Sequence, residues 1–422
     1  MQMVAQSDPL MLTQVVKKDL ANSSAVISEQ NYEYNADGLQ TRKIQYSYYG
    51  GNTYGSKTEW IYDNSTGYLT EEDNFSYDSA TSTFSMSFKT EYLQYDSNGN
   101  ILEEQSSYYD TNNNVWVFNQ KVQYHYNAGV LDYLERFYYD TTSSTWQNQS
   151  KEIYTYTSGL VTLKLNQQWD SVNSQFIDSG KWHYTYDANN LLIEKRFEYY
   201  DTTASAWVDS QKTVNTYDAV THNRLTREVY QWNIANSAWV GNQKDVFTYD
   251  GNGNVSVVES YSFDAANNIW NSYPSNAGTA TYDNTVDRSN LGISEDYSGY
   301  YNFLFNHKID LLHITQYDIN TAQQEPYQDW EFHYTLLSVL GVSENRELKE
   351  VGIYPNPVNN FVNLKGTEKL SDYKLIIYDM QGKQVLYRNG QNKINVQTLP
   401  AGNYIYRVIA KEGVKSGVLL KN

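Results

Sequence analysis

Apolar and polar residues alternate with a period of two through most of the first 340 residues. In Lys121–Tyr126 and Lys151–Tyr156, tyrosines recur at every second position, which places their rings on one face of a β-strand. The segments between such runs have turn chemistry, because Gly and Asn at 96–100 and 250–254 supply the positive φ angles of tight hairpins. No stretch sustains the 3.6-residue period of a helix. The pattern therefore predicts an all-β fold of antiparallel hairpins.

The hairpins recur as a repeat of about 31 residues, marked by a Tyr that Asp or Asn nearly always follows. A fixed period of this length is typical of repeat architectures, in which each unit completes its core on its neighbours. Nine two-strand units predict an antiparallel meander of about 18 strands in a long curved or spiralling sheet. The same alternation would also fit a propeller or a barrel. The marks are Tyr34, Tyr62, Tyr95, Tyr126, Tyr156, Tyr186, Tyr217, Tyr249 and Tyr282.

Each period carries a second set of marks. An aromatic residue followed by Asp or Asn comes 13 to 15 residues after the first mark, a large aromatic seven residues later and, in most units, a Lys five residues further. Rows of exposed Trp can stack on sugar rings, so the Trp members of this set are candidate glycan-stacking residues. These candidates are Trp116, Trp146, Trp207, Trp239 and Trp270.

The Lys column suggests a charge ladder across the sheet. Glutamates that lie 8 to 10 residues past the first Tyr of their units are expected to face the Lys residues and to fix the strand register. They are Glu71, Glu103, Glu135, Glu194 and Glu259.

Two turns carry a motif known from other repeat proteins. Residues 95–101 read Tyr-Asp-x-x-Gly-Asn-Ile, and residues 249–255 repeat this order with a final Val. The motif resembles the YD repeats of RHS and teneurin-type shell proteins. The resemblance is local, because the period here is longer and the unit adds the Trp and Lys marks. It implies a curved, spiralling antiparallel sheet and carries no activity over to this chain.

From about residue 341 the composition changes: Tyr becomes rarer, aliphatic residues increase and the net charge turns positive. Short apolar runs such as Tyr373–Tyr378 and Asn403–Val408, separated by turns, predict a small β-sandwich. The chain reads Tyr-Pro-Asn-Pro at 354–357, Tyr-Asp-x-x-Gly at 378–382, Leu-Pro-x-Gly-x-Tyr at 399–404 and Gly-Val-Lys at 413–415. This order resembles a type A sorting domain of the type IX secretion system.

The resemblance covers roughly 341–422 and implies an Ig-like sandwich that directs export through an outer-membrane translocon in Bacteroidota. It also implies a sortase, which cleaves the domain and releases the cargo or attaches it to surface lipopolysaccharide. The alternative is that the matching residues are only turn and strand positions of a sandwich. By resemblance, the export signal would contain Pro355, Asn356, Pro357, Asp379, Gly382, Leu399, Pro400, Gly402, Tyr404, Gly413 and Lys415.

These marks divide the chain into an N-terminal segment at 1–30, a Tyr-rich hairpin repeat domain at 31–336, a linker at 337–352 and a sorting domain at 353–422. Residues 1–6 resemble the tail of a secretory signal peptide, so we expect the true start to lie further upstream. Residues 284–316 depart from the repeat. We interpret them as a cap on the array, with a ligand-binding loop as the alternative.

Charge divides the chain in the same way. Residues 1–340 carry a net charge of −23 and residues 341–422 one of +5, within a total of −18. A body this acidic should repel nucleic acid and anionic lipid, so both are poor candidate partners. The chain has no Cys, which excludes disulfides, thiolate metal sites and cysteine nucleophiles. No apolar run is long enough to cross a membrane as a helix.

Motifs for catalysis are not found. The six His are scattered, and the spacing of His307 and His313 matches no zinc motif. Residues 96–100 lack the distal Glu of a calcium loop. We therefore expect no cofactor, no metal and no enzyme activity. The alternative is a secreted polysaccharide hydrolase with paired carboxylates, whose separation a sequence cannot measure.

Together these observations predict a secreted or surface-displayed repeat protein that the type IX system exports. Its repeats are expected to act as an adhesin-like binding module or as a structural module. The expected partners are the translocon and the sortase, with glycans or surface lipopolysaccharide as further candidates.

Overall fold

The computed structural model describes residues 9–63, 65–292, 305–337, 351–367, 370, 373–378, 384–410 and 413–422. The chain forms two compact units, one built mainly from Thr41–Tyr334 and one that holds the C-terminal residues 351–422. The elements described are 29 strands and one 3-10 helix. The all-β prediction is therefore confirmed. Most of the expected linker at 337–352 lies outside the described residues.

A large first sheet contains 22 of the strands. They are β1 (Leu10–Asp19), β2 (Ala25–Tyr34), β3 (Gln40–Tyr49), β4 (Asn52–Tyr62), β5 (Leu69–Asp78), β6 (Thr83–Tyr95), β7 (Ile101–Asp110), β8 (Val115–Asn127), β9 (Val130–Asp140), β10 (Thr145–Thr157), β11 (Leu160–Asp170), β12 (Gln175–Tyr186), β13 (Leu192–Asp201), β14 (Ala206–Tyr217), β15 (Arg224–Asn233), β16 (Ala238–Tyr249), β17 (Val255–Asp264), β18 (Ile269–Trp270), β19 (Asn276–Asp287), β20 (Leu291–Gly292), β21 (His307–Asp318) and β22 (Gln323–Leu336). The 3-10 helix η1 spans Arg288–Asn290.

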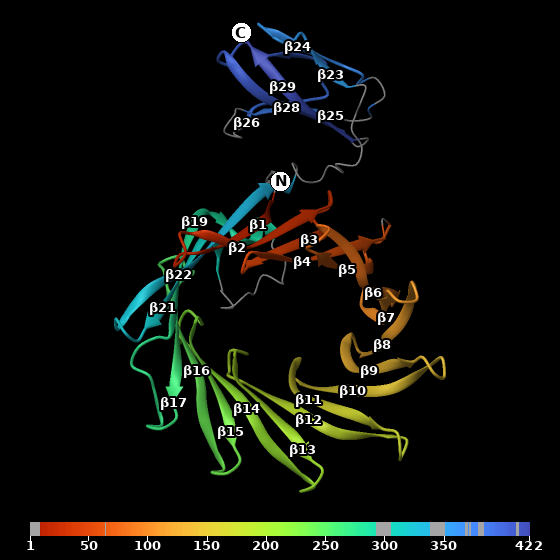
Figure 1. Ribbon diagram of the computed structural model, residues 1–422, viewed down its shortest axis with the longest axis vertical. Helices are drawn as coiled ribbons and strands as arrows, with labels where there is room; N and C mark the ends of the chain where they lie inside the picture. Colours follow the sequence, from red (N-terminus) through yellow and green to blue (C-terminus); the bar gives the residue numbers. More distant parts are fainter. Residues whose placement is uncertain are drawn as a thin grey trace. The chain divides into compact units, whose positions relative to one another are not determined.

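Strands that follow one another in the sequence pair antiparallel around this sheet, as the meander prediction requires. The two ends of the sheet meet, because β1 also pairs with β22. At this junction the Leu20 N–H donates to the Tyr327 carbonyl at 3.0 Å, and the Lys18 ammonium lies 2.5 Å from a Glu331 carboxylate oxygen. The sheet therefore closes as in the barrel alternative rather than staying open or spiralling (Figure 1). Among the described strands, 20 have 10 to 14 residues.

The sheet begins before residue 31, the boundary that the repeat marks suggested. Strands β1 and β2 lie in the expected N-terminal segment, yet both belong to the closed sheet. Leu12 and Val15 of β1 are fully buried. The marks could not reveal this part, because β1 carries no Tyr-Asp pair and its partner β22 lies at the opposite end of the array.

The acidic residue after each aromatic mark holds a turn together. Asp96 Oδ1 accepts the backbone N–H groups of Asn98 and Asn100, and Asp110 Oδ1 accepts that of Asn112. Hydrogen bonds from the Asn100 side chain and backbone lower the pKa of Asp96, so its carboxylate stays charged. The same bond to the N–H two residues on is made by Asp78, Asp140, Asp170, Asp201, Asp218, Asp250, Asp264 and Asp318.

The repeated Tyr ties its unit to the start of the preceding strand. The Tyr156 hydroxyl donates to the Leu131 carbonyl at 2.9 Å, and the Tyr249 hydroxyl donates to the Arg224 carbonyl at 2.9 Å. Donor and acceptor are 25 to 27 residues apart in every such bond, which is close to the length of one repeat. The other bonds of this kind are made by Tyr95, Tyr186, Tyr217 and Tyr282.

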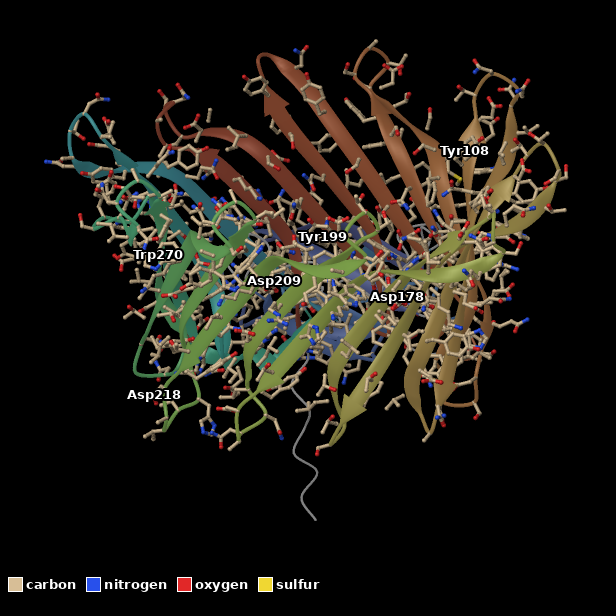
Figure 2. All side chains as sticks on the ribbon, turned by 90° about the horizontal axis from the view of Figure 1, so that it is seen from below. Tyr108, Asp178, Tyr199, Asp209, Asp218 and Trp270 are labelled. Carbon is tan, nitrogen blue, oxygen red and sulfur yellow. The ribbon has the colours of Figure 1, made fainter. Side chains whose placement is uncertain are left out.

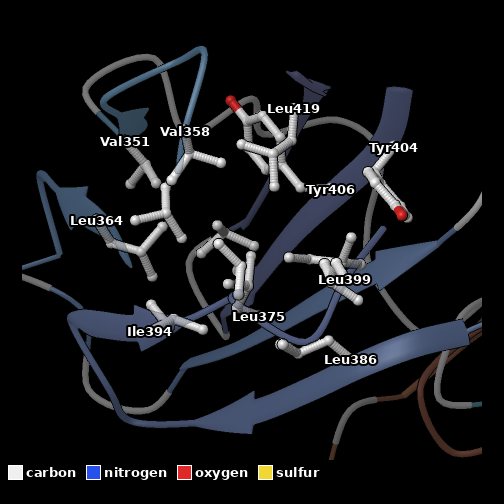
Figure 3. Close-up of a cluster of buried hydrophobic side chains, with 14 residues drawn as sticks. Val351, Val358, Leu364, Leu375, Leu386, Ile394, Leu399, Tyr404, Tyr406 and Leu419 are labelled. Atoms are coloured by element: carbon white, nitrogen blue, oxygen red, sulfur yellow. The ribbon is translucent and has the colours of Figure 1, made fainter. Parts of the chain in front are cut away.

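The C-terminal domain consists of two smaller sheets, as the sandwich prediction requires. Val362, Ile377, Val408 and Leu419 are fully buried members of one hydrophobic core (Figure 3). Its sheets contain β23 (Gly352–Tyr354), β24 (Phe361–Lys365) and β27 (Lys393–Asn395), and β26 (Gln384–Asn389), β25 (Tyr373–Tyr378), β28 (Gly402–Ala410) and β29 (Gly413–Lys421).

The Tyr bond between units can be tested by removing a single oxygen atom. We expect Tyr156→Phe to lower the free energy of unfolding by about 0.5–1.5 kcal/mol, because the Leu131 carbonyl loses its donor. Urea unfolding of the full chain measures this. Tyr49→Phe is the control, since the Tyr49 side chain is 81% exposed and should not change stability. Equal losses in the two variants would contradict the role of the inter-unit bond.

Candidate functional site

The Pro-flanked Asn of the sorting motif is bound to the last strand of the chain. Asn356 Nδ2 donates to the Val418 carbonyl at 2.7 Å, and its Oδ1 accepts the Leu420 N–H at 2.8 Å. Both bonds go to the backbone of β29. The segment with Pro355 and Pro357 is thereby fixed beside the C-terminal strand.

The other sorting candidates lie at the two ends of the β28–β29 pair. Tyr404 is buried and its hydroxyl donates to the Pro400 carbonyl at 2.8 Å, which closes the turn with Leu399 before Gly402. Gly413 pairs with Ala410 and Lys415 with Val408 at the opposite end of these strands. The structure thus brings Leu399, Pro400, Gly402 and Tyr404 together and separates Gly413 and Lys415 from them. Asp379 and Gly382 lie outside the described residues.

The C-terminal domain matches a known family. Residues 352–421 correspond to the family described as "Secretion system C-terminal sorting domain". This match and the two-sheet fold confirm the resemblance to the type IX sorting domain. The protein is therefore a type IX secretion cargo, exported across the outer membrane to the cell surface or the medium.

Solved structures show only remote similarity to the whole chain. A DUF3836 family protein from Bacteroides vulgatus has 19% identity, covers 22% of this chain and 90% of its own, and gives a TM-score of 0.20. A protein of unknown function from Bacteroides fragilis has 14% identity, with 39% and 95% covered and a TM-score of 0.20. TcdB2-TccC3 without its hypervariable C-terminal region has 11% identity, with 97% and 21% covered and a TM-score of 0.30. These values support no inference about function.

No curated protein matches this chain. None of the helices in the described part is both long and apolar enough to cross a membrane. In the same part, no group of three or more His, Asp or Glu side chains is placed to hold a metal ion.

The five candidate Trp residues occupy equivalent places in the closed sheet. Each packs edge-to-face on the aromatic residue opposite it, with ring centroids 5.0 to 5.3 Å apart and planes at 61° to 77°. Trp116 is 37% exposed, and the other four are half-buried. The pairs are Tyr109–Trp116, Tyr139–Trp146, Tyr200–Trp207, Trp232–Trp239 and Phe263–Trp270.

The Lys of one unit covers the Trp of the next. The Lys181 ammonium lies 4.2 Å from the Trp207 ring centroid, and Lys212 lies 4.8 Å from that of Trp239. Lys89 over Trp116 and Lys121 over Trp146 repeat the contact at 5.6 Å. These rings are thus engaged within the sheet, and glycan stacking on them stays a prediction. We call this side of the sheet the Trp face.

The expected Glu ladder is mostly wrong. Of the five predicted glutamates, in the described part only Glu135 contacts its Lys, with 3.4 Å between Glu135 and Lys151. Lys181 pairs instead with Glu198 at 3.0 Å. The reason is the register: a β-bulge in most strand pairs shifts the rungs, so that Glu194 lies opposite Thr185 rather than opposite a Lys.

A second aromatic column runs along the opposite side, which we call the Tyr face. Its members come three residues after each Lys, and residues three apart in a strand point to opposite faces. Cross-strand register connects the column through neighbouring strands, for example from Trp60 through Glu72 and Thr90 to Tyr92. The positions in this column are Trp60, Tyr92, Tyr124, Tyr154, Tyr184, Asn215 and Phe247.

Carboxylates and hydroxyls alternate along this column. The Tyr154 hydroxyl donates to a Glu152 oxygen at 2.8 Å, and Arg136 donates to the other oxygen at 2.7 Å. Burial raises the pKa of Glu104, and burial together with Glu104 raises the pKa of Tyr124. The Tyr hydroxyls therefore keep their protons and act as hydrogen-bond donors on this face.

A polar depression of about 440 Å³ begins the column at strands β3, β4 and β5. Glu72 lies at its centre: one oxygen accepts the Trp60 indole N–H at 3.0 Å, and the other accepts the Asn74 amide at 3.0 Å. Thr58 donates to Asn74 at 2.9 Å, which fixes the amide orientation. Lys43, Gln45 and Ser56 complete the lining. All seven residues lie on the Tyr face by register.

Sequence reasoning missed this depression because it weighed the Trp residues that follow the repeat. Trp60 departs from the pattern: it replaces Tyr at a column position and is half-buried. Aligning the units on their Lys residues would have exposed the exception. The depression has an indole, a carboxylate, amides, hydroxyls and an ammonium group within one concavity, which is the chemistry of a site for a polar ligand.

A carboxyl pair lies on the Trp face of the same strands. Asp73 is only 5% exposed, and burial, followed by the charge and hydrogen bond of Glu71, raises the pKa of Asp73 to about 6. The cross-strand neighbours of Asp73 are Glu59 and Lys89. Asp73 therefore holds its proton at pH values where an exposed Asp is ionised.

This raised pKa gives a signed pH dependence. Between about pH 4 and pH 6 the folded protein holds a proton on Asp73 that the unfolded chain has lost, so stability falls as pH rises through this window. Asp73→Asn cannot ionise and should be more stable than the parent chain above pH 6, by about 1–3 kcal/mol. Near pH 4 the difference should shrink.

Chemical unfolding across this pH range measures the effect. The exposed loop substitution Asp37→Asn is the control and should show no such pH-dependent gain. An Asp73→Asn variant that is equally or less stable at every pH would contradict the assignment.

Proposed function

We propose that the repeat domain is a glycan-binding module, which the sorting domain delivers to the cell surface or the medium. The observation that carries the proposal is the depression of Trp60, Glu72 and Asn74 on the Tyr face. Its groups are held in place before any ligand arrives, because Glu72 already accepts bonds from both neighbours. Preorganised polar groups lose less entropy on binding, which favours affinity.

A saccharide suits the chemistry of this depression. The apolar face of a pyranose ring can pack on the indole of Trp60, while ring hydroxyls exchange hydrogen bonds with the carboxylate of Glu72 and the ammonium of Lys43. The depression holds one acid and one base, so it selects no net charge by itself. The −23 charge of residues 1–340 disfavours polyanions. We therefore infer neutral or cationic glycans as ligands.

A glycan array with the full chain tests the proposal, followed by titration of the best ligand. We expect Trp60→Ala to weaken binding by about tenfold or more, because truncation removes the stacking surface. Glu72→Gln should weaken it as well, since it removes the charge that orients the hydroxyls. Trp207→Ala is the matched control on the Trp face and should leave affinity unchanged. If Trp207→Ala alone abolishes binding, the site lies on the Trp face instead.

A polysaccharide hydrolase is the second candidate function. The pKa of about 6 at Asp73, beside Glu71, resembles the acid member of a catalytic carboxyl pair. The 5% exposure of Asp73 counts against it, because a scissile bond must reach the acid. Release of reducing ends from polysaccharides by the full chain, lost in Asp73→Asn, would favour the hydrolase over the binding module.

A further inference from the structure

The aromatic column of the Tyr face has one polar gap among its described members. Five consecutive units place Trp or Tyr at the position three residues after the Lys, and the unit after the gap places Phe247 there. The sixth unit has Asn215 instead. An amide is much smaller than a phenol, so the sheet surface loses the volume of a ring at this point.

A depression of about 540 Å³ lies at this gap, where β12, β13 and β14 approach the turn that follows Tyr217. Figure 2 shows Asp218, the first residue of that turn, in a loop at the rim of the sheet. Asn215, Glu194 and the hydroxyls of Thr185 and Thr216 are among the lining groups. The lining contains two carboxylates, from Asp187 and Glu194, and no Lys, Arg or His.

The buried amide of Asn215 is only half satisfied. Asn215 is 8% exposed, and its Nδ2 donates to the Leu192 carbonyl at 2.9 Å, which also accepts the Tyr217 hydroxyl at 3.0 Å. Its Oδ1 accepts no hydrogen bond from any described residue. Leaving a buried acceptor without a donor is unfavourable, so a ligand N–H or O–H that reached this oxygen would be stabilising.

The carboxylate of Glu194 also lacks a cationic partner in the described part of the chain. Its cross-strand neighbours are Thr185 and Val214. The Asp187 carboxylate, by contrast, is occupied by the N–H groups of Asn189 and Leu191 in its turn. Arg224 follows the same turn, but its guanidinium lies 4.5 Å from the Phe247 ring centroid and does not line the depression. Glu194 is thus an available anion beside an unmatched acceptor.

We propose that this depression is a second binding site, which takes the primary ammonium group of an amino sugar. Glu194 pairs with the ammonium, Asn215 accepts one of its N–H groups, and the two Thr hydroxyls exchange hydrogen bonds with ring hydroxyls. The site is separate from the Trp60 depression: it lies on other strands and differs in charge. It goes beyond the proposed glycan function because it selects for a positive charge.

Binding of D-glucosamine to the full chain in mildly acidic buffer tests the site, measured by calorimetry with D-glucose as the uncharged comparison. Asn215→Tyr restores the residue of the other units and fills the gap. Glu194→Gln keeps the shape and removes the charge. We expect glucosamine to bind the parent chain more tightly than glucose, and each variant to lose about tenfold or more of that affinity. Thermal unfolding confirms that the variants are folded, and Asn215→Tyr should be at least as stable as the parent chain.

Equal glucosamine affinity in the parent chain and both folded variants would overturn the proposal and assign the binding to the general negative charge of the body. No measurable glucosamine binding to the parent chain would also overturn it. Trp60→Ala separates this site from the proposed function: it should leave glucosamine binding intact, whereas Asn215→Tyr should leave neutral-glycan binding intact.

Discussion

The closed sheet depends on lateral contacts between units, because most of its strand residues are only half-buried and no thick aliphatic core supports them. A ring on one strand must therefore be covered by a side chain two strands away. Lys181 of one unit lies over Trp207 of the next, and Phe118 packs at 5.7 Å on Trp146 in the same manner. Tyr and Lys suit this task, since each has an apolar body and a polar tip that stays hydrated. The 31-residue period is the chemical record of this mutual cover.

The same requirement separates the two faces of the sheet by role. On the Trp face, ring pairs and ammonium groups are consumed by contacts between units, which leaves little free chemistry. On the Tyr face, hydroxyls and carboxylates alternate and two positions break the column, Trp60 and Asn215. Both breaks coincide with depressions. In a repeat protein, the unit that departs from its neighbours is where a ligand can be distinguished from the regular background.

Much of the fold could be predicted from the sequence, because period-two alternation and turn residues are local properties. The meander, the equivalence of Trp116 and Trp146, and the small C-terminal sheets all followed from such local marks. The register could not be predicted. In the β9–β10 pair a β-bulge between Asn148 and Ser150 moves every later rung by one residue, and no residue type announces it. The predicted Glu ladder failed for this reason.

The candidate site was harder to predict than the fold. The Trp residues of the repeat were conspicuous, yet their rings are engaged by Tyr and Lys. Trp60 and Asn215 were visible in the sequence, but their meaning depends on which face they share with Glu72 or Glu194, and that again is register. Closure of the sheet was equally unreadable, because β1 shares no mark with β22.

The β1–β22 junction has a consequence for how the molecule folds. Lys18 and Glu331 are 313 residues apart in the chain, so this seam cannot form until nearly the whole array is available. Until then the first and last strands are open edges, which tend to recruit strands from other molecules. The strong negative charge of residues 1–340 opposes such encounters by mutual repulsion. For an exported protein the acidic body thus protects an intermediate as much as it solubilises the finished ring.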